Sequence, residues 1–292
     1  MEHVQESAEY RRVRSLFISD VHLGSRFANA DAFLAFLEAY QPEFLYIVGD
    51  FVDGWSLRRS WYWTPTYTRI IQHLFDWASQ GVIIRYSPGN HDQFLREHLR
   101  DFLWVEIADE FIHESADQLR YLVLHGDRFD DVELRAPWLS RLGSVGYSAL
   151  LGIDRVINRP RAMLGRKPWR LSGGIKSRIK WVVSFLSGFE QRLVSHAKAS
   201  GCHGVICGHI HTPALTRLGD IDYCNTGDWV ENCSALLEFD DGELRLARFC
   251  HGTGTITHHD ADRSTGAARV PSGLSAKRGN SQPSVPAVRL RP

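Results

Sequence analysis

The chain has 292 residues, enough for one large domain or a domain with an insertion, and 43% of them are apolar, as in globular proteins with a real core. No stretch approaches the roughly 18 consecutive apolar residues of a membrane-spanning helix, and residues 1–14 lack the apolar segment of a signal peptide. The 34 basic and 34 acidic residues balance, so the net charge indicates no broad nucleic-acid partner.

Five short apolar runs along the chain each end directly at polar residues that can bind a metal ion. The runs, each typical of a buried β-strand, span residues 15–19, 44–48, 82–86, 121–124 and 204–207. The polar residues that follow them include Asp20, Asp50, Asn90, His125 and His209. Between the first three runs, residues 30–40 and 67–78 show an apolar spacing of about 3.6 residues, which predicts two helices.

Strands that alternate with helices predict an α/β fold, in which helices cover a sheet that contains parallel strands. In such sheets, ligands bind beyond the carboxyl ends of the strands. Because the five polar residues all stand at strand ends, we expect them to converge on one place. The sequence therefore predicts a single site assembled from segments that are far apart in the chain.

The second half of the chain departs from this rhythm. Residues 128–199 contain no clear strand but several helix-like segments, and residues 141–199 hold twelve Lys or Arg against two acidic residues, interleaved with aromatic and aliphatic side chains. This composition favours a helical insertion that contacts an anionic membrane surface, or one that holds an acyl chain together with a diphosphate. An ordinary helical subdomain with a solvated basic face and a nucleic-acid-binding surface are alternative interpretations.

The C-terminal part combines a hairpin signal with a polar tail. Residues 235–239 and 244–249 flank an Asp-Asp-Gly-Glu turn, which indicates a β-hairpin. From residue 252 onward the chain is rich in Gly, Ser, Pro, Arg and His without apolar periodicity, which predicts disorder. The predicted organisation is a core of residues 14–127 and 200–250, an insertion at 128–199 and a disordered tail at 252–292. The five cysteines form no CxxC pair and are expected to be free thiols of a cytoplasmic protein.

The residue types at the strand ends are those of a metal centre with nitrogen and oxygen ligands. Asp20 and His22 are two residues apart, so both side chains point to the same side of an extended segment, and His209 and His211 repeat this spacing. The Asp50 carboxylate could bridge two cations. Mixed ligation of this kind is typical of manganese, iron, zinc or cobalt. The candidate metal ligands are Asp20, His22, Asp50, Asn90, His125, His209 and His211.

Together, these motifs resemble the five blocks of the calcineurin-like metallophosphoesterase superfamily. The blocks read DVH at 20–22, GDFVD at 49–53, GNHD at 89–92, HGD at 125–127 and GHIH at 208–211. The resemblance implies a four-layer α/β/β/α sandwich with a helical insertion, and a hydrolase that uses two divalent metal ions. It assigns one ion to Asp20, His22, Asp50 and His211, and the other to Asp50, Asn90, His125 and His209.

His91 follows the candidate ligand Asn90 and is expected at the mouth of this site. Its imidazole could stabilise the charge of the transition state or protonate the leaving group. Asp92 is a candidate to orient His91, and Asp53 is a candidate to support the site from behind the ligands. For both carboxylates, capping of a helix is the alternative interpretation.

The insertion between the HGD and GHIH blocks also resembles the layout of the UDP-2,3-diacylglucosamine diphosphatases. That resemblance implies cleavage of UDP-2,3-diacylglucosamine to UMP and lipid X in lipid A biosynthesis, with manganese as the metal and iron or zinc as alternatives. It also implies peripheral attachment to the cytoplasmic face of the inner membrane. The chain has His91 where those enzymes carry arginine, and residues 223–229 look like those of a sister group. Another lipid or sugar-nucleotide phosphate therefore stays open as the substrate.

Two further functions stay open at this point. A phosphodiesterase or nuclease acting on nucleotides or nucleic acid would use the same chemistry, although the balanced charge disfavours broad nucleic-acid binding. A catalytically inactive scaffold is disfavoured, because all seven candidate ligands and His91 are present. No motif indicates an obligate protein partner.

Overall fold

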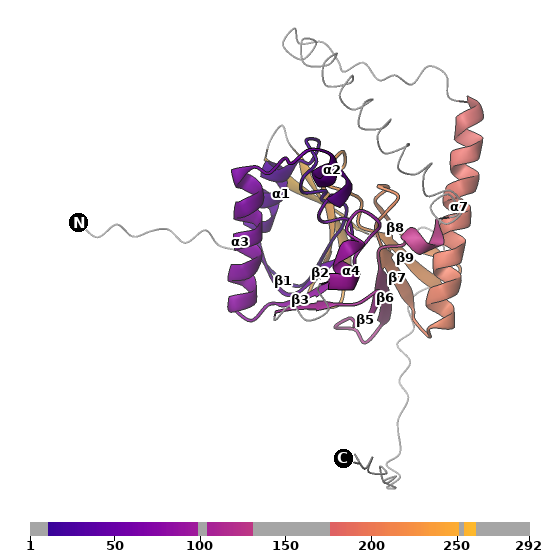
Figure 1. The fold of residues 1–292 in the computed structure, drawn as a ribbon. Coiled ribbons are helices and arrows are strands. Elements are labelled where there is room, and N and C mark those ends of the chain that lie inside the picture. Colours follow the sequence, from indigo (N-terminus) through magenta and orange to yellow (C-terminus); the bar gives the residue numbers. More distant parts are fainter. Residues whose placement is uncertain (1–10, 99–103, 131–175, 251–253, 261–292) are drawn as a thin grey trace, which may run out of the picture.

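The computed structural model describes residues 11–98, 104–130, 176–250 and 254–260 (Figure 1). Most of the insertion predicted at 128–199 lies outside these ranges, and so does the predicted tail beyond residue 260. Within the described part of the chain, no helix combines the length and the apolar character needed to cross a lipid bilayer. The five cysteines are free thiols, as the sequence predicts, and all but Cys250 are buried.

The larger of two sheets contains, among the described residues, seven strands in the order β12-β11-β10-β1-β2-β3-β4. The four strands β1 to β4 run parallel, and β10, β11 and β12 extend the sheet as antiparallel neighbours. The β10–β11 pair is the hairpin that the sequence predicts. The strands are β1 (Arg11–Ile18), β2 (Tyr40–Ile47), β3 (Ile83–Tyr86), β4 (Val105–Ile107), β10 (Ser234–Glu238), β11 (Leu244–Cys250) and β12 (Thr255–Asp260).

The smaller sheet has five strands in the described part of the chain, in the order β5-β6-β7-β9-β8. Its central strands β6, β7 and β9 are parallel, and each edge strand is antiparallel to its neighbour. The carboxyl ends of β6 and β7 therefore meet at one edge of this sheet, as those of β1, β2 and β3 do in the other. The strands are β5 (Glu110–Glu114), β6 (Arg120–Leu124), β7 (Gly204–Cys207), β8 (Ala214–Leu218) and β9 (Ile221–Asn225).

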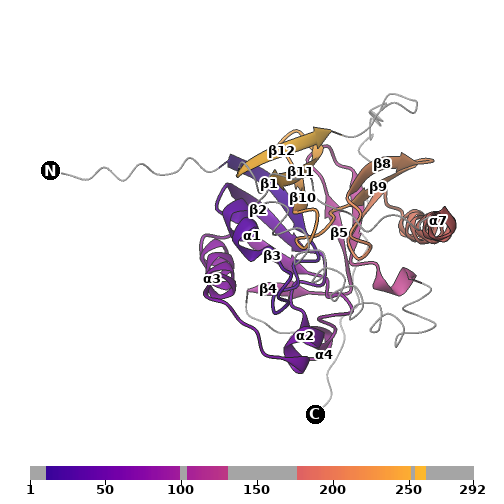
Figure 2. The same cartoon turned by 90° about the horizontal axis from the view of Figure 1, so that it is seen from above.

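The two sheets stack face to face between two layers of helices (Figure 2). Helices α1 (Ala30–Leu37) and α3 (Pro65–Ser79) pack on the outer face of the larger sheet, and α7 (Lys176–Ala199) packs on the smaller one. An apolar cluster that includes Phe17 and Ile206 fills the space between the sheets. This arrangement confirms the predicted four-layer α/β/β/α class. Three short helices lie near the strand ends: α2 (Gly54–Arg59), α4 (Phe94–His98) and the 3-10 turn η1 (Asp127–Phe129).

Local sequence explains where α3 begins and which face it buries. The Thr64 side chain accepts a hydrogen bond from the Tyr67 backbone N–H, and Pro65 occupies the first turn, where a missing N–H costs nothing. Past the end of the helix, Gly81 adopts a left-handed φ of 94°, which suits the residue that turns the chain into β3. The buried side chains recur every three or four residues, as a helix on a sheet requires. They are Tyr67, Ile70, Leu74 and Trp77.

The structure corrects the predicted start of the tail. Residues 255–260 form β12 rather than a disordered segment, and this strand pairs with β11 along the edge of the larger sheet. Its sequence, TITHHD, has a single aliphatic residue, Ile256, which is partly buried against the core. The strand is held by backbone pairing rather than by an apolar pattern, so periodicity gives no signal for it.

A buried carboxylate, Glu238, ties the end of β10 to its neighbours. One oxygen accepts hydrogen bonds from Ser15 Oγ (2.6 Å) and contacts His113 Nε2 (2.8 Å), and the other accepts from Arg14 Nη1 (2.6 Å) and the Ala116 backbone N–H (2.8 Å). Burial alone would raise the pKa of Glu238, but the contacts with His113 and Ser15 overcome it and hold that pKa below its usual value. The folded protein therefore favours the ionised form.

We expect Glu238→Gln to lower the free energy of unfolding by about 1.5–3 kcal/mol at pH 7, the range for hydrogen bonds to a charged group. Because the folded pKa is depressed, this stabilisation is complete above the unfolded pKa and is lost as pH falls through the folded value. Urea titrations at pH 7 and in mild acid should therefore show a shrinking difference from wild type. The exposed Glu43→Gln on β2 is the matched control. A pH-independent difference would contradict the assignment.

Candidate metal centre

The candidate ligands occupy the loops at the carboxyl ends of five strands. Those after β1, β2 and β3 come from the larger sheet, and those after β6 and β7 come from the smaller one. Stacking of the sheets brings the two sets of loops together. In chain order they are Asp20 and His22 after β1, Asp50 after β2, Asn90 after β3, His125 after β6, and His209 and His211 after β7.

The backbone at five of these residues lies in the left-handed region. The φ angles are 53° at Asp20, 54° at His22, 51° at Asp50, 70° at His209 and 51° at His211. Asp and His tolerate this region better than most residues, yet each such position costs the fold of the order of 1–3 kcal/mol. Strain that recurs at one place marks a functional site.

Glycines beside the ligands are required by close approach. A Cβ atom at Gly89 would overlap Asp50 Oδ1 and the His125 ring, and one at Gly208 would press on Asp20 Oδ2. The Gly89-Asn90 and Gly208-His209 pairs in the motifs therefore reflect how tightly the loops pack.

The acidic and histidine ligands form two groups whose ligand atoms lie within 4.8 Å of one another. In the first group, His211 Nε2 lies 3.1 Å and His22 Nε2 lies 3.9 Å from Asp20 Oδ1. In the second, His125 Nε2 lies 3.4 Å from Asp50 Oδ2, and His209 completes the group. Asp50 also clusters with His22 and His91, which places its carboxylate between the two groups.

Four buried ligand atoms lack a hydrogen-bond partner among the described residues. They are Asp20 Oδ1, His22 Nε2, Asn90 Oδ1 and His125 Nε2. A buried polar atom without a partner costs about 1–3 kcal/mol, so native proteins leave few of them. Other such atoms are scattered over the described residues, but these four lie together at the candidate ligands, and their nitrogen and oxygen chemistry suits transition-metal cations. The residues present therefore fit a pair of divalent ions.

Hydrogen bonds to the far ring nitrogens orient two of the histidines. His125 Nδ1 lies 2.8 Å from the Val48 carbonyl oxygen and donates to it, which leaves Nε2 facing Asp50. His209 Nε2 lies 3.0 Å from Asp130 Oδ2, which leaves Nδ1 for a metal. Such outer contacts fix ring orientation and tautomer in metal sites. Asp130 is not among the residues predicted from the sequence, because nothing but its place shortly after the HGD block sets it apart.

We expect Asp130→Asn to weaken metal binding by roughly 10–100-fold, the usual effect of losing a carboxylate behind a histidine ligand. Competition with a chromogenic chelator measures this directly, without reference to turnover. The exposed Asp240→Asn in the β10–β11 turn changes the charge equally and should bind metal like wild type. Unchanged affinity in the Asp130 variant would show that His209 needs no such support.

His91 lies beside the ligands and is held on two sides. Its Nδ1 lies 3.0 Å from Asp53 Oδ1, and its Nε2 lies 4.0 Å from Asp50 Oδ2. The ring of Trp55 lies over the imidazole with ring centres 3.9 Å apart. Asp53 also accepts a hydrogen bond from the Ser56 backbone N–H as the N-cap of α2, so it both supports the site and caps a helix. Trp55 is a neighbour that the sequence analysis missed.

Asp92 does not take the position predicted for it. Its carboxylate is fully buried and accepts hydrogen bonds from the backbone N–H groups of Gly89 (2.6 Å) and Phe51 (2.7 Å), and from the Tyr86 hydroxyl. No hydrogen bond joins it to His91 among the described residues. Asp53 makes the orienting contact instead. Asp92 braces the loops after β2 and β3 against each other, because its two oxygens are taken up by backbone donors.

Opposite charges set the protonation of the ligands. Burial would raise the pKa of Asp20, but the imidazole of His211 overcomes it and lowers that pKa to about 2. Burial opposes a charge on His211 in turn, yet the Asp20 carboxylate raises its pKa to about 9. For His22, burial and then the nearby His91 lower the pKa to about 4, which keeps it neutral and ready to bind a metal. Cations that bind His211 must displace its proton.

The loop after β9 fixes the ligand loops from behind. Asn225 Nδ2 donates to the Gly208 carbonyl oxygen (2.7 Å), and the Thr226 hydroxyl lies 2.6 Å from Ser19 Oγ. The Trp229 backbone N–H donates to the Asp20 carbonyl oxygen (3.0 Å). Residues 223–229, which stood out in the sequence, therefore position the first and last motif.

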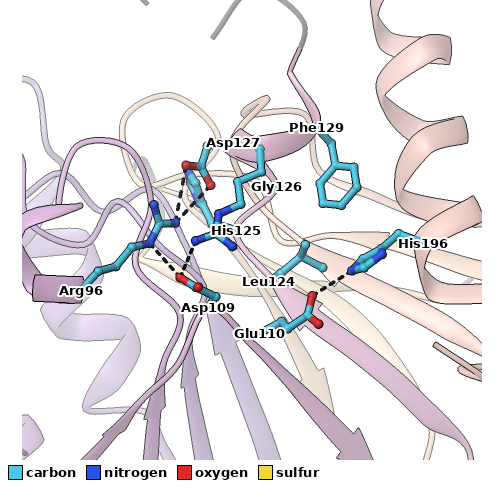
Figure 3. Close-up of a pocket in the computed structure, with 10 residues that line it drawn as sticks. Arg96, Asp109, Glu110, Leu124, His125, Gly126, Asp127, Phe129 and His196 are labelled. Atoms are coloured by element: carbon cyan, nitrogen blue, oxygen red, sulfur yellow. Dashed lines mark hydrogen bonds and ion pairs between the residues drawn. The ribbon is translucent and has the colours of Figure 1, made fainter. Parts of the chain in front are cut away.

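A pocket of about 470 Å³ opens beside His125 (Figure 3). Figure 3 shows Arg96 reaching between Asp109 and Asp127, with Nε 3.1 Å from Asp109 Oδ1 and Nη2 3.4 Å from Asp127 Oδ1. Arg96 Nη2 also donates to the Pro88 carbonyl oxygen. This guanidinium links the loop that carries Asn90 to the HGD block, and its charge is already matched by two carboxylates.

Comparison with known proteins places the sequence in one family. Residues 13–213 match the calcineurin-like phosphoesterase model. Among curated relatives, UDP-2,3-diacylglucosamine hydrolase of Vibrio parahaemolyticus is 26% identical over 78% of this chain and 95% of its own length. The enzymes of that name from Aliivibrio fischeri and Haemophilus influenzae (strain PittGG) are 31% and 25% identical over 77% and 78% of this chain, and 94% and 95% of their own lengths. The chain therefore belongs to the calcineurin-like phosphoesterase family and is a metal-dependent phosphoester hydrolase.

Proposed function

We propose that this protein hydrolyses the diphosphate of UDP-2,3-diacylglucosamine and releases UMP and lipid X, a step of lipid A biosynthesis. The observation that carries the proposal is the extent of the similarity. Three relatives named for this hydrolase align over 94–95% of their own lengths, so the match is not confined to the common core. The acyl chains of this substrate would bring the protein to the cytoplasmic face of the inner membrane as a peripheral protein.

Two divalent cations would occupy the two ligand groups, with the Asp50 carboxylate shared between them. We propose manganese, which the resemblance to the UDP-2,3-diacylglucosamine diphosphatases implies. The mixture of histidine nitrogens with carboxylate and amide oxygens suits manganese, and iron and zinc are the alternatives. One ion would be held by Asp20, His22, Asp50 and His211, and the other by Asp50, Asn90, His125 and His209.

When bound, two such ions would neutralise phosphoryl charge and lower the pKa of a water molecule to near neutrality. A water oxygen would bond to one phosphorus of the diphosphate as the bond from that phosphorus to the bridging oxygen breaks, and a proton of the water would pass to solvent. His91 is the protein group placed to meet the charge on the departing phosphate. Asp53 holds Nδ1 and so aims Nε2 at the site, where it can donate a proton. Burial opposes a positive charge on His91, but the carboxylates of Asp50 and Asp53 overcome it and raise the pKa of His91. The raised pKa favours the protonated ring.

Hydrolysis of UDP-2,3-diacylglucosamine by the manganese-loaded protein tests the proposal, with UMP measured by chromatography. Two reference substrates run beside it: UDP-glucosamine, which lacks the acyl chains, and bis-p-nitrophenyl phosphate, a generic diester. We expect release of UMP from the acylated substrate far above both references.

Other outcomes identify the alternatives. Equal cleavage of UDP-glucosamine would overturn the lipid assignment and favour a nucleotide phosphodiesterase. Cleavage of the generic diester alone would keep the two-metal chemistry and reject the substrate. Retained metal without hydrolysis of any ester would mean an inactive scaffold.

A further inference from the structure

An exposed aromatic and basic segment joins α2 to α3. We name it the tip, and it consists of residues 58–63, Arg58-Arg59-Ser60-Trp61-Tyr62-Trp63. The Trp61 side chain is 75% exposed, more than any other large apolar side chain in the described part of the chain. Arg58 and Arg59 are exposed beside it in the last turn of α2. Covering an exposed indole is favourable, because burial of one aromatic side chain removes roughly 150 Å² or more of surface from water. Trp61 is therefore a candidate contact residue for a partner.

The tip is held rigidly from below. The Tyr62 and Trp63 rings pack edge-on against Tyr67 of α3, with ring centres 6.1 and 5.4 Å away. Trp63 Nε1 donates to Thr68 Oγ1 (3.1 Å), and the Trp61 ring stacks on Trp63 with centres 6.1 Å apart. Trp61 therefore stands on a fixed aromatic base, which lowers the entropy lost when a partner covers it.

The charge of the tip is positive and unopposed by its own segment. Residues 54–75 contain no Asp or Glu. Neither Arg58 nor Arg59 forms an ion pair with any described residue, and the Arg26 guanidinium lies 5.0 Å from the centre of the Tyr62 ring. The acidic residues that contact residues 54–75 engage groups outside the tip: Asp31 accepts from Thr66 (2.7 Å), Glu38 pairs with Arg69 (3.1 Å), and Asp53 accepts from Ser56 (2.8 Å). A partner for the tip should therefore combine negative charge with an apolar layer.

The tip is also close to the metal centre. Helix α2 begins at its N-cap Asp53, whose carboxylate contacts His91. The helix spans about 9 Å over its six residues, the last two of which belong to the tip. In Figure 1, α2 stands at the end of the molecule opposite β5.

We propose that the tip docks this protein on an anionic lipid bilayer, with Trp61 at headgroup depth and the arginines on lipid phosphates. Indole and phenol rings prefer the interface between headgroups and acyl chains, and arginines next to them add electrostatic attraction to anionic lipid. The flat, charged and partly apolar bilayer surface matches the mixed character of the tip better than a purely polar phosphate backbone does. Docking there would hold the site beside diphosphates that project from the membrane, a consequence that rests on the proposed function.

Flotation of the full-length, metal-loaded protein with lipid vesicles tests the docking without any turnover. We expect binding to vesicles of phosphatidylcholine with about one third phosphatidylglycerol, little binding to phosphatidylcholine alone, and release as salt rises. The double variant Arg58→Ser/Arg59→Ser should bind roughly 25-fold more weakly, because each arginine near an anionic surface contributes about fivefold. Trp61→Ala should also bind several-fold more weakly.

Matched variants on other faces separate the tip from general surface effects. Ile112→Ala removes a 46% exposed side chain from β5, and Arg217→Ser removes an exposed arginine from β8. Both should bind vesicles like wild type. Turnover of soluble bis-p-nitrophenyl phosphate confirms that each variant keeps its fold and metals, and separates this test from the proposed function.

Two results would overturn the docking. The first is vesicle binding that the tip variants leave unchanged. The second is a protein that does not bind vesicles but binds a single-stranded oligonucleotide through the tip. That result would assign the tip to nucleic-acid binding.

Discussion

Asp50→Asn is expected to retain fewer than two metal ions per chain and to lose hydrolysis of every phosphoester. Asp50 shares ligand-atom clusters with both His22 and the pair His125 and His209, so its loss affects both halves of the centre. The loss in rate should be at least the roughly 10²–10³-fold that one charge-stabilising group contributes. Elemental analysis of the purified variant, together with turnover of bis-p-nitrophenyl phosphate, measures both effects.

Asparagine is the informative replacement at this position. Its shape matches aspartate and it tolerates the left-handed backbone found there, so the fold should survive and the missing charge becomes the variable. The exposed Asp240→Asn makes the same chemical change at a distance. Full two-metal occupancy with near-normal turnover in Asp50→Asn would refute a bridging role.

His91→Gln should keep both metals and lose roughly 10²–10⁴-fold in turnover, the range for a group that moves a proton or meets developing charge. The imidazole lies 4.0 Å from Asp50 Oδ2, and its far nitrogen is engaged by Asp53. Metal content and steady-state rates on an activated aryl ester and on the diphosphate substrate give the two readouts.

His91 also falls within a ligand-atom cluster with His22 and Asp50, so a direct metal contact is the competing assignment. Loss of one metal from His91→Gln would establish that assignment and end the proton-transfer role. Asp53→Asn offers a matched comparison, because it leaves His91 in place, keeps a residue that can cap α2, and removes the negative charge beside Nδ1. A partial loss of rate with both metals retained is expected there.

The strand ends were predictable because two independent signals coincide at each of them. A short apolar run such as 204–207 demands burial, and the polar pair His209 and His211 that follows needs polar partners or a metal ion wherever it is buried. Strand geometry then places the pair at a sheet edge. The structure confirms strands before Asp20, Asp50, Asn90, His125 and His209, and brings the loops that carry them together.

Features that depend on a contact between residues far apart in the chain were not predictable from the sequence. The separation of β1 and β6 into different sheets follows from the packing of their faces, which a local pattern does not encode. Asp130 is one carboxylate among many until the fold brings it to His209, and Trp55 gains meaning only by lying over His91. The prediction for Asp92 was wrong for the same reason. Its neighbour in sequence is His91, but its carboxylate binds the backbone N–H groups of Phe51 and Gly89.

Left-handed turns at the metal centre limit how this protein can be changed by selection or design. Glycine adopts that backbone without strain, so a glycine in place of His22 or His209 would release free energy that the fold now stores. The same replacement deletes a ligand. Selection for heat resistance alone would therefore favour replacement of the metal ligands. A thermostable variant that still hydrolyses its substrate must gain its stability elsewhere, in the outer helices or between the sheets.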